Sequence, residues 1–440
     1  MHTKKHLSFS SLRKSLSNTI NNIKDDRHRH KIEYSLHDTV MSSFACMYYQ
    51  DPSLLQFQKR LEDELHNSNT RTLFQINKIP KETQIRETLD QIDSSHFEEV
   101  FKNFYMQLQR GKHLEQYRLL DGLYYCPIDG SEYYSSKNIH CENCLTKEHK
   151  KGSVTYSHQV LQGGIMHPEQ KSVIPFMPEE ISNKDGDTKQ DCEMNAGKRF
   201  LSKIKKQFPK LKFIIGGDAL FSRQPIIEDI LSKEMHYIFV AKESDHKYMY
   251  EWLKAYPKLN SLTHTEKNKE YFYEWMCDVP LNGRKDSINT NFFRCTVITK
   301  NKKGEVTNTF KCCWVTDLEI TKENIEMLVK TARCRWKNEN EVFNVMKNHG
   351  YDMTHNYGHG DKNLCFNFYI LTILAFYMHQ IFELTDNLYK KCRVKFGSKR
   401  HMWETFRAYI KIVIFDTWEE LLGFALKPDQ FRLLKLESAP

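Results

Sequence analysis

Short apolar segments and helical segments alternate between Tyr117 and Ala241, and this alternation constrains the fold of the chain more than any other feature. Lys212 to Ile215 and His236 to Ala241 are apolar runs typical of strands buried on both faces of a sheet. A helix from about Gln190 to Phe208 is expected before them. The sequence therefore predicts an α/β sheet domain.

Helical patterns flank this domain on both sides. Before Arg110, apolar residues recur at three- and four-residue spacing, which predicts a small helical bundle that either contacts DNA or is only structural. The apolar stretch from Cys365 to Phe382 is interrupted by Asn367 and His379, so a buried core helix is favoured over a membrane span.

Three regions follow from these patterns. Residues 1–112 are expected to form a helical DNA-binding domain, and residues 113–360 the sheet domain. A β-rich insertion is expected within the sheet domain at about 243–318, because strand-like runs replace the strand–helix alternation there. Residues 361–440 are expected to be a helical C-terminal region.

Charge and cysteine usage limit the class of protein only broadly. The chain has 440 residues and a formal net charge of +9, which favours polyanionic partners such as nucleic acid. Its twelve cysteines are irregularly spaced, and no apolar signal segment follows the Met-His-Thr-Lys-Lys-His start. We expect a cytoplasmic, nucleoid-associated protein with no membrane partner.

Two aspartates fall at predicted strand positions. Asp121 interrupts the apolar segment from Tyr117 to Tyr125, where an unpaired charge is costly. Asp218 follows the buried strand Phe213 to Gly217, at the end where open α/β sheets place ligands. Two acids on one sheet can share a metal ion, although either residue alone is also typical of a turn or a helix cap.

A glutamate in a predicted long helix supplies the third acid. The helix is expected to run from after Thr321 to about Asn348. Arg335 and Glu339 are four residues apart and so share one face, as a structural salt bridge or as part of a metal and phosphate site. Glu341 is the second choice for the metal ligand, because it does not follow an arginine by four residues.

Leu120-Asp121-Gly122, Gly217-Asp218-Ala219 and Arg335-Trp336-Lys337-Asn338-Glu339 together resemble the acid–acid–glutamate signature of the DDE transposases of bacterial insertion sequences, specifically the IS-four family. The resemblance covers about 117–360, including a β insertion between the second and third acids. In the Tyr-Arg-Glu-Lys signature of that family, Arg335 and Glu339 fit. Ala332 stands at the tyrosine position and Met346 at the lysine position, with Lys347 next.

The resemblance implies a ribonuclease-H-like, retroviral-integrase-like mixed sheet and a cut-and-paste transposase. Asp121, Asp218 and Glu339 would hold two Mg²⁺ or Mn²⁺ ions for phosphodiester cleavage and strand transfer. Arg335 and Lys347, with Arg333 and Lys337, would bind DNA. The expected partners are double-stranded DNA with terminal inverted repeats, target DNA and a second copy of the chain. The alternatives are a non-catalytic DNA-binding descendant and a metal-dependent nuclease on the same fold.

A second group of residues has the spacing of a metal site. Cys141 and Cys144 form a Cys-x-x-Cys pair, and histidines follow them. This pattern suits structural Zn²⁺ in a reducing compartment, with unligated loop thiols as the alternative. The expected ligands are Cys141, Cys144 and His149, and either His158 or His140 is the fourth.

Two tryptophans and one basic segment are further candidates for contact with DNA. Trp275 and Trp314 lie among apolar residues of the predicted insertion, where core packing is favoured over stacking on a DNA base. The positive charge from Lys390 to His401 favours contact with phosphate.

Overall fold

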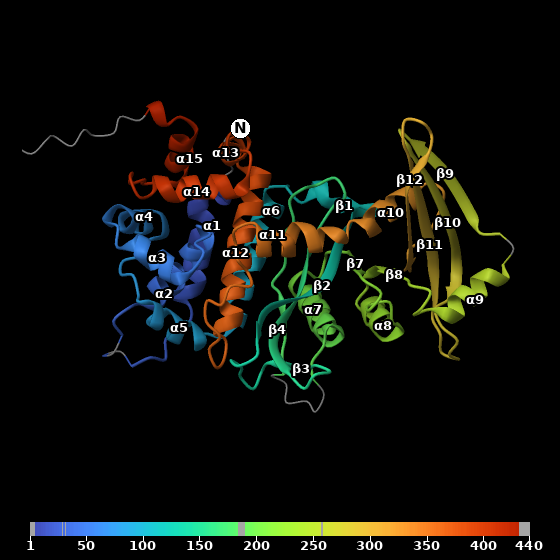
Figure 1. Ribbon diagram of the computed structural model, residues 1–440, viewed down its shortest axis with the longest axis horizontal. Helices are drawn as coiled ribbons and strands as arrows, with labels where there is room; N and C mark the ends of the chain where they lie inside the picture. Colours follow the sequence, from blue (N-terminus) through green and yellow to red (C-terminus); the bar gives the residue numbers. More distant parts are fainter. Residues whose placement is uncertain (1–4, 29, 31, 184–189, 257, 431–440) are drawn as a thin grey trace, which may run out of the picture.

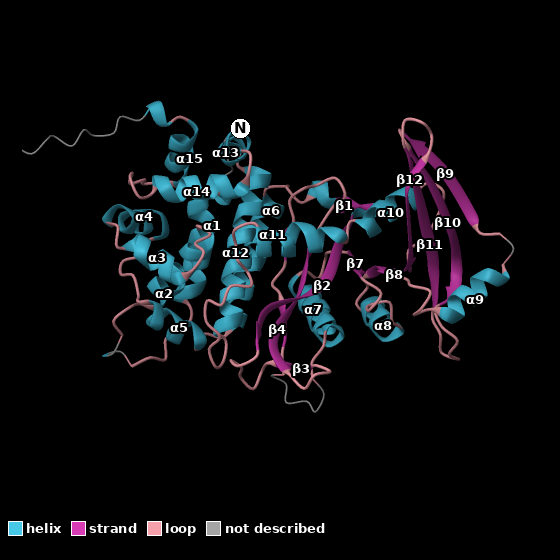
Figure 2. Ribbon diagram, in the orientation of Figure 1, coloured by secondary structure: helices cyan, strands magenta, loops and turns pink. Residues whose placement is uncertain are grey.

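The computed structural model describes residues 5–28, 30, 32–183, 190–256 and 258–430. Along the longest axis, a helical body, a central sheet with its own helices, and a group of long strands follow one another (Figure 1). Figure 2 shows the same separation of helices and strands by colour. The α/β class expected from the sequence is confirmed at this level.

The helical body contains both ends of the described chain. Its N-terminal helices are α1 (Phe9–Asn21), α2 (Leu36–Tyr48), α3 (Leu54–Leu61), α4 (Glu64–Phe74), α5 (Glu82–Asp90) and α6 (Glu98–Arg110). Its C-terminal helices are α12 (Leu364–Thr385), α13 (Asn387–Phe396), α14 (Lys399–Tyr409) and α15 (Trp418–Leu426). The short helices are η1 (Lys5–Leu7), η3 (Ser94–Phe97), η4 (Glu115–Tyr117), η5 (Leu120–Gly122) and η7 (Pro428–Gln430).

The two helical regions predicted from the sequence pack against each other. α12 lies against α2 and α5. The Trp418 ring of α15 stacks on Phe9 of α1 with 5.2 Å between ring centroids. Residues distant in sequence therefore share one apolar core, which stabilises both regions together.

α12 is long and apolar enough to span a membrane by composition, but 94% of its apolar window is buried inside the fold. Its polar residues have partners there: Asn367 donates to the carbonyl oxygens of Leu89 and Ile92. The Gln380 side chain accepts the Val173 amide. These contacts identify α12 as a core helix, as the interrupted apolar pattern indicates.

The central sheet is built from strands before and after α7 (Glu193–Gln207) and α8 (Gln224–Ser232). Its strands are β1 (Arg118–Leu119), β2 (Leu123–Ser136), β3 (Leu145–Glu148), β4 (Val154–Ile165), β5 (Ile174–Pro175), β6 (Glu179–Ile181), β7 (Phe213–Gly217) and β8 (His236–Val240). β4 is antiparallel to β2, β3 and β6. β7 is parallel to both β2 and β8, so the sheet is mixed.

The predicted β-rich insertion continues this sheet. After α9 (Lys247–Ala255) it forms β9 (Asn260–Glu266), β10 (Lys269–Pro280), β11 (Asn289–Lys300) and β12 (Val306–Thr316). β12 pairs with β8, with Trp314 opposite Val240. The strand order is β3-β4-β2-β7-β8-β12-β11-β10-β9. The β9 strand was not expected, because it is almost entirely exposed and its sequence lacks an apolar alternation.

The long helix predicted up to Asn348 is divided. α10 (Ile325–Arg333) ends before Cys334, the π-helical segment η6 spans Asn338–Phe343, and α11 (Asn344–Asn348) follows. π-helical turns are rare and are frequent at functional sites. The side chains of Lys337 and Asn338 hold this irregular segment against the sheet.

Candidate functional site: carboxylates on the central sheet and a Cys/His cluster

Asp129 and Asp218 lie at the same level on neighbouring parallel strands. In the β2–β7 register, Pro127 stands opposite Gly216, and each aspartate follows two residues later. Both side chains are half-buried. The backbone amide of Leu220 donates to one Asp218 carboxylate oxygen at 2.8 Å, and that of Gly130 donates to Asp129 at 3.1 Å. The parallel pairing thus brings two acids level with each other, one within β2 and one directly after the last residue of β7.

The segment that begins η6 is fixed over these strands by two buried side chains. The Asn338 side-chain amide donates to the carbonyl oxygen of Gln162 at 3.0 Å. The buried Lys337 ammonium donates to the carbonyl oxygens of His167, Pro168 and Gln170 at 2.8, 3.2 and 2.6 Å. Charged hydrogen bonds of this kind are the stronger ones, so they set the position of the residues on either side.

Arg335 faces the first aspartate from this anchored segment. Its Nη1 atom lies 3.4 Å from Oδ2 of Asp129, and both side chains are partly exposed. Burial raises the pKa of Asp129 to about 6, Arg335 opposes this effect, and the charges of Asp218 and Glu339 raise the pKa further. Three acids and one arginine therefore act on each other electrostatically.

Glu193, which the sequence analysis did not single out, is a fourth acid in this group. It lies in the first turn of α7 and packs over Gly130, where an added Cβ would stand 2.3 Å from its carboxylate. Burial raises the pKa of Glu193 to about 7, and the charges of Asp129 and Asp218 add to the effect. Acidic residues are common in the first turn of a helix, where they interact favourably with the helix dipole, so the position of Glu193 in the sequence did not indicate a site.

Of the two glutamates left open by the sequence, Glu339 is among the principal charges that act on Asp129, and Glu341 is not. The Glu339 side chain is exposed. The three carboxylates of Asp129, Asp218 and Glu339 do not meet the 4.8 Å ligand-atom spacing that the Cys/His cluster meets among the described residues.

The structure does not bring Asp121 to this site. Asp121 is exposed in η5, before β2 begins, with a backbone φ of 53°. Gly122 follows with a φ of 86°, so Leu120-Asp121-Gly122 is a left-handed turn and not a continuous strand. Asp129 comes eight positions after Asp121, a span of roughly 26 Å in extended chain. The turn alternative for this aspartate describes its position, and Asp129 is the acid of β2 that lies level with Asp218.

The basic residues predicted to bind DNA have different surroundings. Arg335 is half-buried beside Asp129. Lys337 is 8% exposed and its ammonium donates to backbone carbonyl oxygens, which contradicts its predicted role in DNA binding. Arg333 is exposed, with its guanidinium carbon 4.9 Å from the centre of the Phe310 ring. Lys347 of α11 lies over the Phe343 ring at 5.9 Å and is partly exposed.

The tryptophans near the site differ in their exposure to solvent. Trp275 and Trp314 are buried in the core, at 3% and 2% exposure, so neither is available to stack on a base. Trp336 is 47% exposed and follows Arg335 directly. Trp336 lies in the break between α10 and η6, which no local sequence pattern predicts.

Much of the positive charge between Lys390 and His401 is used within the fold. The Lys395 ammonium donates to the carbonyl oxygens of Ala425 and Leu426. Arg393 and Lys399 both approach the carboxylate of Glu383. These contacts leave fewer cations for the expected binding of phosphate by this segment.

A second group of side chains gathers where β2 turns into β3. Cys141, Cys144, His158 and His359 could hold a metal ion, because one ligand atom of each lies within 4.8 Å of all the others. His158 is on β4, opposite Tyr134 of β2, and His359 comes from the loop before α12. Cys144, His158 and His359 are buried.

Two histidines expected at this cluster lie elsewhere. The exposed His149 side chain hydrogen-bonds the Thr155 hydroxyl at 2.8 Å. The ring of His140 stacks on Tyr156 with 4.0 Å between centroids. His359 takes the remaining position, although it is 201 residues from His158. Spacing within a short segment favoured His149, and no local pattern connects His359 to the cysteines.

No protein-family model matches this chain, and no curated protein matches it either.

Proposed function

We propose that this protein is a DDE-type DNA transposase whose carboxylates are Asp129, Asp218 and Glu339. The observation that carries the proposal is the level position of Asp129 and Asp218 on parallel strands, with Glu339 and Arg335 held above them by Lys337 and Asn338. Carboxylate oxygens are the ligands that Mg²⁺ prefers. Mutual repulsion between the half-buried Asp129 and Asp218 carboxylates, to which the charge of Glu339 adds, favours a divalent cation.

The strand directions support the same proposal. β2, β4 and β6 are successive antiparallel neighbours, and β7 and β8 join the other side of β2 in parallel. This is the arrangement expected of a ribonuclease-H-like sheet, with its acids on the first and fourth strands and on a later helix. The long strands β9 to β12 then correspond to the insertion between the second and third acids.

Asp129, Asp218 and Glu339 would hold two Mg²⁺ or Mn²⁺ ions, which would supply activation of a water molecule or a 3′-hydroxyl and stabilisation of the leaving oxygen. Glu193 would add negative charge behind Asp129. Arg335 would leave Asp129 and bind a DNA phosphate, since a guanidinium recognises both groups with the same donors. Trp336, Arg333 and Lys347 are the neighbouring side chains exposed enough to contact the DNA.

The test uses the full chain and linear DNA that carries the inverted repeats flanking its own gene. The expected result is Mg²⁺-dependent cleavage at the repeat ends, followed by joining of the freed 3′ ends to a second DNA. Cleavage without joining would replace the proposal by a metal-dependent nuclease. Specific binding without cleavage would replace it by a non-catalytic DNA-binding protein.

A further inference from the structure

The distances within the Cys/His cluster are those of a tetrahedral metal site. Zn–S and Zn–N bonds of about 2.3 and 2.05 Å place tetrahedral ligands about 3.8 Å apart for two sulfurs, 3.6 Å for sulfur and nitrogen, and 3.3 Å for two nitrogens. Cys141 Sγ and Cys144 Sγ are 3.9 Å apart, and His158 Nε2 and His359 Nε2 are 3.1 Å apart. Cys144 Sγ lies 3.4 and 3.3 Å from the two histidine nitrogens.

We propose that Cys141, Cys144, His158 and His359 bind one structural zinc ion, which fastens the loop before α12 to the central sheet. Two sulfur and two nitrogen ligands in a tetrahedral arrangement are a closed zinc set, with no position left for a substrate. The site is independent of the proposed carboxylate site and of any transposase activity.

The group behind the His359 imidazole orients it as a zinc ligand, and a carboxylate lies near the outer nitrogen of His158. His359 Nδ1 lies 2.6 Å from the carbonyl oxygen of Gly360, so it carries the proton and leaves the Nε2 lone pair for the metal. His158 Nδ1 lies 3.6 Å from a carboxylate oxygen of Glu180. Metal-binding histidines commonly have such a carbonyl or carboxylate behind the ring.

The turn that carries the two cysteines is also shaped for a metal. The amide of Cys144 donates to the carbonyl oxygen of Cys141 at 3.2 Å, and the amide of Cys141 lies 3.5 Å from the Cys144 sulfur. A disulfide would require about 2.05 Å between the sulfur atoms, so the observed 3.9 Å separation fits two thiolates on one ion and not a bonded pair.

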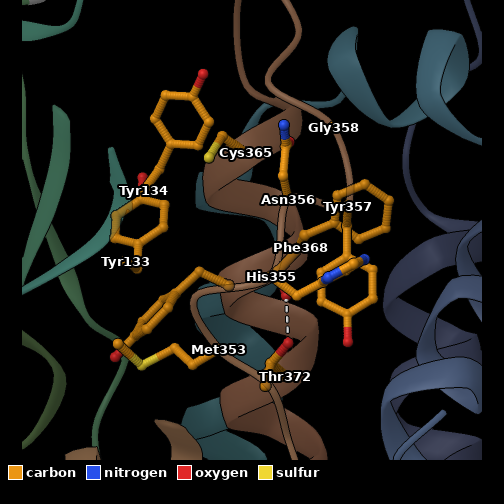
Figure 3. Close-up of a pocket in the computed structure, with 11 residues that line it drawn as sticks. Tyr133, Tyr134, Met353, His355, Asn356, Tyr357, Gly358, Cys365, Phe368 and Thr372 are labelled. Atoms are coloured by element: carbon orange, nitrogen blue, oxygen red, sulfur yellow. Dashed lines mark hydrogen bonds between the residues drawn. The ribbon is translucent and has the colours of Figure 1, made fainter. Parts of the chain in front are cut away.

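The position of His359 gives the ion its structural effect. The loop that joins α11 to α12 follows the segment carrying Glu339. This loop passes beside α12, and Tyr133 and Tyr134 of β2 lie across from it (Figure 3). The His359 ring lies 4.6 Å from the Tyr134 ring. Zinc would bond this loop to β4 and to the turn after β2.

The helical body holds the same loop from its other side. Arg86 of α5 donates to the carbonyl oxygen of Tyr357 at 2.7 Å. The Asp90 carboxylate accepts the backbone amides at the start of α12, namely those of Asp361, Lys362, Asn363 and Leu364. His359 lies between these two anchors. The ion therefore stands at the junction of the sheet with the helical body.

The first experiment is elemental analysis of the purified full chain. About one zinc ion per chain is expected, and X-ray absorption should show two sulfur neighbours at about 2.3 Å and two nitrogen neighbours at about 2.05 Å. Absence of bound zinc from protein prepared with zinc in the medium overturns the proposal. A Cys141–Cys144 disulfide found by mass spectrometry under reducing preparation would do the same.

Variants then test the ligand set. His359→Gln and Cys144→Ser should lose most of the zinc, and limited proteolysis should cut segment 349–363 faster in both. The matched control His149→Gln should retain about one ion per chain. Zinc retained by His359→Gln, or lost by His149→Gln, would contradict the assignment. If the variants do not fold, removal of zinc from the wild-type chain by a chelator must expose segment 349–363 to protease; unchanged cleavage rejects the structural role.

Discussion

Asp129 and Asp218 lie level with each other on the neighbouring parallel strands β2 and β7, and the side chain of Arg335 reaches Asp129 from the segment that carries Glu339. Arg335 partly offsets the repulsion between these half-buried carboxylates.

Asp129→Asn should abolish Mg²⁺-dependent cleavage of the repeat ends, by about 10³-fold or more, because metal ions contribute several kcal/mol to such reactions. Asp121→Asn should cleave at close to the wild-type rate, since Asp121 lies in an exposed turn before β2. Initial cleavage rates of the two variants are the measurement. Loss of activity in Asp121→Asn with activity kept in Asp129→Asn would restore the original assignment.

Trp336→Ala should weaken binding to DNA ends with unpaired bases, because stacking of one base on an aromatic ring contributes about 1–3 kcal/mol. That range corresponds to roughly 5- to 150-fold in Kd. Fluorescence anisotropy with a single-stranded overhang measures it. Tyr248→Ala is the matched control, since Tyr248 is 49% exposed but lies on α9, beside the inserted strands. Equal effects of the two changes would exclude a specific role for Trp336.

Lys337→Met and Lys347→Met should separate a structural lysine from a DNA-binding one. Loss of the buried ammonium leaves three carbonyl oxygens without that donor, so Lys337→Met should lower the free energy of unfolding by on the order of 2–4 kcal/mol. Lys347→Met should leave stability nearly unchanged but reduce the salt dependence of DNA binding by about one unit of log–log slope. Denaturant unfolding and salt titrations measure these quantities; the reverse pattern would refute both assignments.

His66 should make the folded chain sensitive to acid. It is fully buried, and burial lowers its pKa to about 2, with Arg60 and Lys411 adding to the effect. In the unfolded chain its pKa is about 6.5, so between pH 6.5 and 2 the unfolded state binds a proton that the folded state does not. Stability therefore falls as pH decreases below 6.5, by up to about 1.4 kcal/mol for each pH unit.

The test of this linkage is His66→Phe, which suits a site where Tyr49 and Phe57 already contact the ring. At pH 5 the variant should gain about 2 kcal/mol relative to wild type, compared with their difference at pH 7. His96→Phe, at an exposed position, is the control. Unfolding curves of wild type and His66→Phe that shift in parallel from pH 7 to 5 would show that another group is responsible.

The sequence predicted the strands and helices around the carboxylates, but Asp129 was not singled out from it. The run from Tyr124 to Ile128 is apolar and ends at Asp129, just as Phe213 to Gly217 ends at Asp218. An acid directly after an apolar run is therefore common to both strands, although β2 itself continues to Ser136. Asp121 was preferred because a charge within an apolar segment was treated as a strand residue, whereas Asp121 and Gly122 form a turn.

Residues that depend on tertiary contacts could not be found in the same way. His359 joins two cysteines more than two hundred residues earlier through the packing of a loop, and spacing arguments favoured the local His149. Lys337 looks like a surface cation in a basic segment, but the carbonyl oxygens that bury it belong to residues 167–170. Its burial follows from the fold and not from a local pattern.

The most direct test of the central proposal is the location of Mn²⁺ by anomalous scattering in crystals soaked with the ion. The proposal predicts two peaks roughly 4 Å apart, contacting Asp129, Asp218 and Glu339, and absent from Asp129→Asn crystals. Manganese bound at Asp121, or no ion near Asp129 and Asp218 even with end DNA present, would contradict it.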